Sequence, residues 1–167
     1  MTIGIGWGKT RSAAVPAIVP RNPEGIRVMS LLGGLTRVSA QTGMSDIFLR
    51  ARSLDMAIVS VGDLRPHIVF RQYWLLTSEE LATLERAGAI GDVLRHFVDV
   101  DGNIVDHPVN RRVLAVNPKG LRGTRKIVRA LGCWLKNGAI SAALKLLQPR
   151  VLIVDELVAE RLAGDAP

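Results

Sequence analysis

Cysteine and aromatic side chains are scarce in this chain: Cys133 is the one cysteine, and Phe, Trp and Tyr make up 4% of the residues. A single cysteine excludes an internal disulfide and a thiolate metal cluster. With so few aromatics, Val, Ile, Leu and Ala must fill the core, as in a buried parallel sheet covered by helices. No run approaches the roughly 20 apolar residues that span a bilayer, and Gly4 to Lys9 stand where the apolar part of a secretory signal should be. We therefore expect a cytoplasmic protein with no membrane partner.

The overall composition is that of one folded domain covering residues 1–167, with 48% apolar and 22% charged residues. The formal net charge of +7 favours anionic partners. However, the basic residues are scattered, and the dense clusters are Arg111-Arg112 and "KGLRGTRK" (119–126). Because neither cluster belongs to a recognisable DNA-reading element, we expect a solvated surface or phosphate contact rather than direct nucleic-acid binding.

Strand-like and helix-like stretches alternate along the chain. Strands are predicted at "TIGIGWG" (2–8), "IRVMSLL" (26–32, closed by Gly33-Gly34), "DMAIVSVG" (55–62), "RRVLAV" (111–116), "KIVRAL" (126–131) and the buried "VLIVDE" (151–156). Helices are predicted at 10–19 (weakened by Pro16), 44–52 (capped by Ser45 or Asp46), 77–88, 135–147 and 156–164. A hairpin is predicted at 95–106, turning at Asp101-Gly102. This order implies an α/β fold with a mostly parallel sheet flanked by helices and a small β-hairpin insertion.

Two other local signals are specific. Thr77 and Glu80 have capping-box spacing, and Gly88 is placed to end the helix that they start. His67, His96 and His107 show no metal-ligand spacing, and we expect His96 and His107 to be solvent-facing or hydrogen-bonded structural residues. We expect no metal and no cofactor.

The stretch "GIGWGKT" (4–10) ends like a nucleotide-binding P-loop. A P-loop places four residues between its first glycine and Gly-Lys-Thr, whereas three residues separate Gly4 from Gly8. The dinucleotide pattern G-x-G-x-x-G also fails, because its third glycine position is Lys9. Turning glycines before a helix start, with Lys9 and Thr10, still favour an anion. The alternative is that these glycines only form a tight strand-to-helix turn.

Several stretches together resemble the sugar-binding, effector-sensing domain of SorC-type, or DeoR-like, bacterial transcriptional regulators. "GIGWGKT" is similar to the family's "vGvGwGrT", "MSLLGGL" to its second strand, and "DMAIVSVGDL" to its "aDvalvgiG" strand. "LERAGAIGDVLRHFVDVDGNIVD" (84–106) resembles the family's "GAVGD" stretch, which is the most specific piece. Residues 131–162 resemble its late lysine-led helix and last strand. These pieces keep the family order and cover most of the chain.

The resemblance implies a fold related to ribose-phosphate isomerases and glucosamine-phosphate deaminases, and a domain that binds a phosphorylated sugar or polyol without catalysis. It also implies a homo-oligomer that contacts DNA only through a separate domain not present in this chain. The first glycine loop would hold the phosphate, and an acid and a lysine would reach the rest of the ligand. The ligand-binding positions that it implies are Gly6, Trp7, Gly8, Lys9, Thr10, Gly33, Gly34, Gln41, Asp92 and Lys136.

The residues themselves allow the same reading for two of these positions. Lys136 begins a predicted helix after a strand, so its ammonium can point into the crevice at the carboxyl ends of the strands. Asp92 is expected in a loop, where it can accept hydrogen bonds from sugar hydroxyls. The alternatives are a solvated helix-start lysine and a helix N-cap, respectively.

The chain departs from the family pattern near residues 52–55. The family carries an additional helix and strand between the pieces that here meet at Ser53-Leu54, so the domain is expected to be shortened, with an uncovered sheet edge that favours self-association. Three alternatives to the sensor remain open. One is an isomerase-like or deaminase-like enzyme, for which Asp63, Asp92 and Asp155 are the candidate loop acids. Another is an NTP hydrolase, which would show Mg-dependent ATP binding through Lys9. The third is a truncated dimerisation module without ligand.

Overall fold

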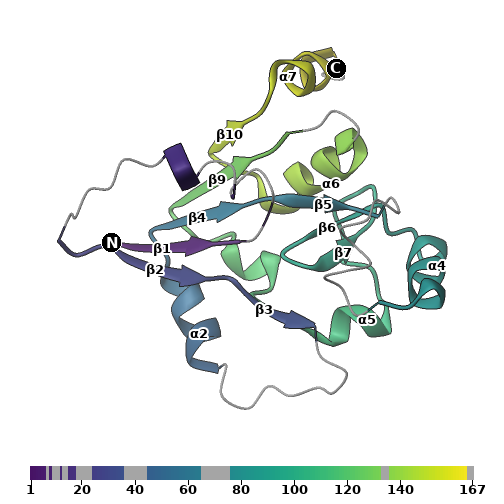
Figure 1. The fold of residues 1–167 in the computed structure, drawn as a ribbon, viewed down its shortest axis with the longest axis horizontal. Helices are drawn as coiled ribbons and strands as arrows, with labels where there is room; N and C mark the ends of the chain where they lie inside the picture. Colours follow the sequence, from purple (N-terminus) through teal and green to yellow (C-terminus); the bar gives the residue numbers. More distant parts are fainter. Residues whose placement is uncertain are drawn as a thin grey trace.

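A five-stranded parallel sheet forms the centre of the molecule (Figure 1). The structure is a computed structural model that describes residues 1–6, 8, 12, 15–17, 24–35, 45–64, 76–132 and 136–164. The strands lie in the order β10-β9-β4-β1-β2, and every pairing between them is parallel. Their bounds are β1 Thr2–Ile5, β2 Arg27–Ser30, β4 Met56–Val59, β9 Lys126–Ala130 and β10 Val151–Ile153. The predicted α/β fold with a mostly parallel sheet is confirmed.

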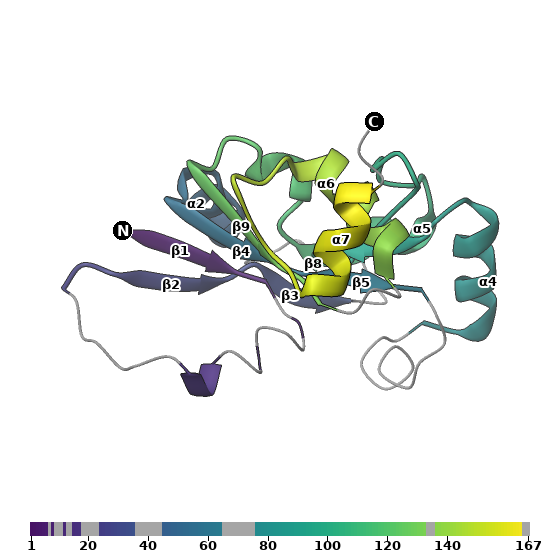
Figure 2. The same cartoon turned by 90° about the horizontal axis from the view of Figure 1, so that it is seen from above.

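Helices cover one face of this sheet (Figure 2). They are α2 (Ser45–Arg50), the 3-10 helices η2 (Ala51–Ser53) and η3 (Pro118–Leu121), α6 (Asn137–Leu147) and α7 (Glu156–Gly164). The predicted spans at 135–147 and 156–164 correspond to α6 and α7. The main core cluster joins Ala57, Val59 and Ile127 of the sheet to Ile140 and Leu147 of α6. The 3-10 helix η1 (Val15–Ala17), which contains the predicted helix breaker Pro16, lies on the opposite side of the sheet.

Two small antiparallel sheets extend the structure beyond the carboxyl ends of β2 and β4. One joins β3 (Leu32–Leu35) to β8 (Val113–Ala115), and the other has the order β5-β6-β7. The strands of the second are β5 Val61–Asp63, β6 Gly91–Val93 and β7 His96–Val98. A second hydrophobic cluster, which contains Leu84, Phe97 and Val109, lies between this sheet and two helices, α4 (Ser78–Arg86) and α5 (Pro108–Arg111).

These sheets correct three of the predicted strands. The stretch 55–62 is not one strand but two, because the chain leaves the parallel sheet at Ser60 and continues as β5 in another sheet. Gly33 and Gly34 do not close the second strand; they lie within β3, where Gly34 is opposite Leu114. The stretch 111–116 is strand only from Val113, and it pairs with β3 rather than with the parallel sheet.

The hairpin also differs from the prediction. The antiparallel pair is β6 and β7, joined at Leu94-Arg95. The predicted turn at Asp101-Gly102 exists, with Gly102 at φ 80°, but it supports only a single bridge between Val98 and Ile104. Asp99 organises that turn, because its Oδ1 accepts hydrogen bonds from the backbone N–H groups of Asp101 and Asn103. The second arm of the predicted hairpin is therefore not a strand.

The end signals of α4 are confirmed. Thr77 accepts a hydrogen bond from the Glu80 N–H, and the Glu80 carboxylate accepts one from the Thr77 N–H. Gly88 follows the helix with φ 83°, a backbone conformation that glycine adopts without a steric penalty. Local capping chemistry thus fixes both ends of this helix.

The edge strands of the parallel sheet are more exposed than expected. The stretch "VLIVDE" predicts a buried strand, but Leu152 and Ile153 of β10 are 38% and 55% exposed, because β10 has one sheet neighbour among the described strands. At the other edge, Val28 of β2 is 63% exposed. Both edges therefore present aliphatic side chains to solvent.

Within the described ranges, every helix is too short or too polar to cross a bilayer.

Candidate functional site

The strand order predicts a ligand-binding crevice at one point of the sheet. The strand β2, which follows β1 in the chain, lies on one side of β1. The strand β4 lies on the other side of β1, and β9 lies beyond β4. In open α/β sheets, ligands bind where successive connections diverge in this way, at the carboxyl ends of the strands. Here that point lies between the ends of β1 and β4, so Gly6 and Ser60 border it.

Gly6 and Gly8 are placed at this point by close packing. The Gly6 N–H donates a 2.8 Å hydrogen bond to the Ile58 carbonyl, which keeps Gly6 in register with β4. A Cβ on Gly6 would lie 2.9 Å from Leu94 Cδ2, and one on Gly8 would lie 2.9 Å from Ser60 Cβ and collide with Ser60 Oγ. The space beside Gly6, about 10 Å³, is enough for one water molecule. A side chain at either glycine would therefore require Leu94 or Ser60 to move.

A backbone hydrogen bond with helical spacing links Gly8 to Ser12. The Gly8 carbonyl accepts a 3.0 Å hydrogen bond from the Ser12 N–H, four residues later. The predicted helix start after the glycines is consistent with this bond. Trp7, Lys9 and Thr10, which the sequence predicts as the phosphate-binding neighbours, lie outside the described residues, as does Gln41.

Asp92 lies in a strand and not in the loop that the sequence predicts. It is the central residue of β6, it is 6% exposed, and it pairs with Gly62 of β5. Its Oδ2 accepts a 2.9 Å hydrogen bond from the Arg95 N–H. A Cβ on Gly62 would collide with Oδ1 of this carboxylate. The missing side chain at Gly62 thus makes the space in which the Asp92 carboxylate lies.

Burial raises the pKa of Asp92 to about 6. The hydrogen bond from Arg95 and the positive charges of Arg95 and Lys136 oppose this shift, and the negative charge of Asp63 adds to it. Among these groups, Arg95 is itself half-buried, and burial lowers the pKa of its guanidinium while the Asp92 carboxylate opposes that shift. Asp92 is therefore a carboxyl group that gains or loses its proton close to neutral pH.

Lys136 occupies the N-cap position of α6, with φ −97° and ψ 12°. The first turn of α6 packs directly on β6, because a Cβ on Gly91 would lie 2.5 Å from the Ala139 Cβ. This close approach brings the charge of Lys136 near Asp92, where it favours the carboxylate. The predicted position of Lys136 at a helix start is confirmed.

The turn between β6 and β7 joins the glycine loop to Asp92, and sequence reasoning missed it. Leu94 and Arg95 both have positive φ, 50° and 65°, the conformation of a type I′ hairpin turn. That turn normally uses Asn and Gly, so "VLRHF" carries no signal for it. Leu94 is buried and faces Gly6, and the His96 Nδ1–H donates to the Leu94 carbonyl at 3.1 Å. Strained non-glycine backbone of this kind is concentrated at functional sites.

The structure thus brings Gly6, Asp92 and Lys136 to one place, and adds Ser60, Asp63 and Arg95 to them. Gly33 and Gly34 lie further along the chain in β3, and their strand partner is β8 rather than any element of this group. The candidate acids of the enzyme alternative are also distributed differently from the prediction. Asp63 and Asp92 are strand residues, and Asp155 caps α7 by accepting a hydrogen bond from the Val158 N–H.

Comparison with known proteins identifies the family. Residues 36–163 match the Sugar-bind family, described as a putative sugar-binding domain, and the chain belongs to this family. It is 23% identical to the "Deoxyribonucleoside regulator" of Bacillus subtilis over 98% of this chain, and 26% identical to the "Erythritol catabolism regulatory protein EryD" of Brucella abortus over 97%. These relatives are therefore regulatory proteins, and the resemblance to SorC-type and DeoR-like regulators is confirmed.

The fold comparison agrees. The full-length sorbitol operon regulator SorC of Klebsiella pneumoniae superposes with a TM-score of 0.83 over 96% of this chain and 64% of that chain, at 20% identity. The chain spans 64% and 63% of the length of the two curated relatives. Their matches extend over 202 and 200 residues, at least 33 more than the 167 of this chain, so each relative carries segments with no counterpart here.

Proposed function

We propose that this chain is the effector-sensing domain of a transcriptional regulator, and that it binds a phosphorylated sugar or polyol in the crevice between β1 and β4. The observation that carries the proposal is the convergence of the glycine loop with Asp92 and Lys136. The glycine loop offers backbone N–H groups to an anion. Asp92 and Lys136 offer an acceptor and a donor to hydroxyl groups, so one ligand can engage both.

The chemistry of the two ends supports this orientation. In the proposed complex, the phosphate lies at Gly6 to Thr10, where Lys9 adds a positive charge, and the hydroxyl-bearing end reaches Asp92, Lys136 and Arg95. The family resemblance adds Gly33, Gly34 and Gln41 to the proposed contacts, with Gly33 and Gly34 placed in β3, outside the group of Gly6, Asp92 and Lys136. Because the pKa of Asp92 is about 6, its carboxyl accepts a hydrogen bond when ionised and can donate one when protonated, and a hydroxyl group can pair with either form.

The experiment is a melting-temperature titration against pentose, hexose and polyol phosphates, each paired with its unphosphorylated counterpart and with inorganic phosphate. We expect at least one phosphorylated compound to raise the melting temperature, because a ligand that binds only the folded state stabilises it. Asp92→Asn and Lys136→Gln should each reduce the shift. Asp106→Asn and Lys145→Gln, which change exposed residues outside the crevice, should leave it unchanged.

One observation favours the enzyme alternative and gives it a test of its own. A carboxyl group with a pKa of about 6 is suited to act as a general base near neutral pH. The same ligand panel is therefore followed by NMR for isomerised or deaminated product. Stabilisation without turnover supports the sensor, whereas product formation that Asp92→Asn abolishes would replace it with an enzyme. Failure of every compound to shift the melting temperature would favour a dimerisation module without ligand.

We also propose that the domain is a shortened form of its relatives and that it forms a homo-oligomer. The exposed aliphatic side chain of Val28 on the edge strand β2 and the longer matched lengths of the relatives support this reading. DNA contact by a regulator of this kind would use a separate domain for sequence reading. Sedimentation velocity over a hundredfold range of concentration tests the oligomer, and a constant monomer mass would contradict it.

A further inference from the structure

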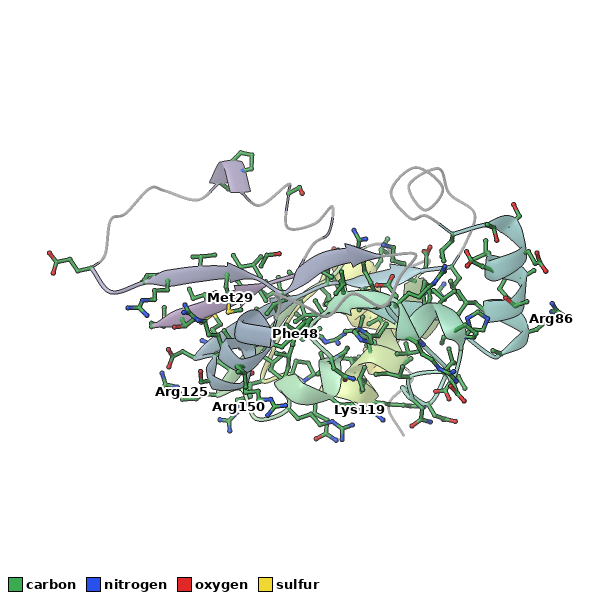
Figure 3. All side chains as sticks on the ribbon, turned by 90° about the horizontal axis from the view of Figure 1, so that it is seen from below. Met29, Phe48, Arg86, Lys119, Arg125 and Arg150 are labelled. Atoms are coloured by element: carbon green, nitrogen blue, oxygen red, sulfur yellow. The ribbon has the colours of Figure 1, made fainter. Side chains whose placement is uncertain are left out.

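Basic side chains that are scattered along the sequence gather at the amino-terminal edge of the parallel sheet. We define this basic edge by seven exposed cations: Arg27, Arg52, Lys119, Arg122, Arg125, Lys126 and Arg150. Arg27, Lys126 and Arg150 begin, or directly precede, β2, β9 and β10, which are parallel, so they lie at the same end of the sheet. Figure 3 shows Arg125, Arg150 and Lys119 along one border of the molecule, away from Arg86 on α4.

Hydrogen bonds and shared cavity walls connect the members of the basic edge. The Arg150 N–H donates to the Ile127 carbonyl, next to Lys126, and the Arg122 Nε–H donates to the Leu146 carbonyl at the end of α6. Arg52 and Gly120 line the same cavity of about 370 Å³, which brings η2 next to η3. The segment "KGLRGTRK" therefore contributes four cations to one continuous edge that Arg27, Arg52 and Arg150 extend.

Carboxylates compensate this edge only in part. Asp55 pairs with Arg125 at 3.2 Å and also accepts a hydrogen bond from the Thr2 N–H, and Glu24 lies in the turn before β2. Seven cations against these two carboxylates leave a net charge of +5 among the described residues of the edge, in a chain whose total is +7. Most of the excess positive charge of the protein thus lies on one side of the fold.

From this concentration we infer that the basic edge binds the phosphate backbone of duplex DNA without reading its sequence. Five parallel strands at a spacing of about 4.8 Å give a rigid edge about 19 Å wide, along which B-DNA carries about 11 phosphate charges. Phosphate contacts need positive charge but no reading element. The choice of DNA over another polyanion rests on the proposed function, because the relatives are regulators.

The position of the basic edge is compatible with a bound effector. The crevice lies at the carboxyl ends of the strands and the basic edge at their amino ends, about 15 Å apart along the five residues of β9. A sugar phosphate and a DNA backbone can therefore occupy the domain together. A change in crevice occupancy would not have to displace the DNA.

The test uses the full chain and a fluorescein-labelled 20-base-pair duplex of arbitrary sequence, with anisotropy measured between 50 and 200 mM salt. If the five net charges each neutralise one phosphate, the affinity should fall about 500-fold over this range. For the double variant Lys126→Gln with Arg150→Gln, the affinity for the duplex should fall only about 40-fold over the same range of salt. Both residues are exposed, and within the described part of the chain neither side chain takes part in a hydrogen bond or ion pair, so the Arg125–Asp55 pair remains.

The matched control removes the same charge elsewhere, with Arg86→Gln and Arg161→Gln on α4 and α7, and should behave like the parent protein. Equal salt dependence of the two double variants, or absence of duplex binding at 50 mM salt, would overturn the inference. So would tighter binding to phosphatidylglycerol vesicles or to polyglutamate than to the duplex. The sugar-phosphate melting shift is measured on the same variants. If it is absent while duplex binding remains, the proposed function fails and the DNA contact stands.

Discussion

Arg129 gives the sharpest test of the physical reasoning about this fold. It lies on β9 between Val59 of β4 and Leu152 of β10, and its side chain is fully buried. It shares the helix-covered face of the sheet with Ile127, two residues earlier on the same strand, which belongs to the main core cluster. Within the described part of the chain, its Nε, Nη1 and Nη2 atoms have no hydrogen-bond partner. A guanidinium with five N–H donors is thus embedded among aliphatic groups.

The magnitude follows from the cost of burying that charge. Burial lowers the pKa of Arg129 to about 10, which corresponds to about 3 kcal/mol less favourable free energy for the charged side chain in the folded state. Even a buried charge that has an ionic partner can often be replaced by hydrophobic residues of similar volume with a neutral effect or a gain of roughly 1–4 kcal/mol. We therefore expect Arg129→Met to raise the free energy of unfolding by about 3 kcal/mol, or the melting temperature by about 6–12 °C.

The assay is urea unfolding followed by circular dichroism, supported by calorimetry. A higher urea midpoint with an unchanged slope would identify a pure stability change. Arg150→Met, at an exposed position, is the control and should stay within about 0.5 kcal/mol of the parent protein. If Arg129→Met is instead less stable than the parent by more than about 1 kcal/mol, the guanidinium is satisfied in the folded protein and the reasoning is refuted.

Two further predictions concern Asp92 and its surroundings. Between pH 4 and about 6 the folded state keeps a proton on Asp92 that the unfolded state releases, so the stability of the parent protein falls as pH rises through this window. Asp92→Asn should therefore be more stable than the parent protein at pH 8, by up to about 3 kcal/mol, and nearly equal to it at pH 3.5. Equal melting-temperature differences between the two proteins at both pH values would contradict the burial of this carboxyl. Gly62→Ala should destabilise the protein by about 1–3 kcal/mol, because its Cβ would collide with the Asp92 carboxylate, and it should abolish the ligand-induced rise in melting temperature. Gly123→Ala is the control, since its Cβ would meet no atom within 4 Å. Matching denaturation midpoints for the two variants would show that Asp92 has room to move.

Local signals in the sequence were sufficient for the elements that local chemistry controls. The capping box at Thr77 and Glu80 and the glycine after α4 act within one or two helical turns, so their residues alone predict them. The apolar spacing of α6 likewise reports the face that it buries. The break at Ser60 could not be predicted, because a single apolar stretch supplies two sheets and only the pairing partners of β4 and β5 distinguish them.

The candidate site shows the same division. Gly6 and Lys136 stand where the alternation of strands and helices predicts, at the ends of elements, whereas Asp92 does not. Its strand β6 exists because Gly62 and Gly91 have no side chains and allow β5 and α6 to approach from two sides. Gly62 is 30 residues from Asp92 in the sequence, and Ala139, which packs on Gly91, is 48 residues from it. No local pattern could therefore indicate this requirement. Arg129 is the converse case, since "KIVRAL" predicts a strand but not a fully buried charge.

The turn at Leu94-Arg95 connects the parts of the site that the sequence could not join. Leu94 lies against Gly6, and the Arg95 N–H holds the Asp92 carboxylate. Because both residues have positive φ, and side chains disfavour that conformation, the turn depends on the packing of Leu94, the hydrogen bond from His96 to the Leu94 carbonyl and the hydrogen bond from Arg95 to Asp92. An occupant of the crevice that contacts Gly6 and Asp92 therefore bears on two of these supports. In the proposed complex, ligand binding would change the balance that holds the β6–β7 hairpin against the glycine loop, and this would be a physical route from an effector to a conformational response.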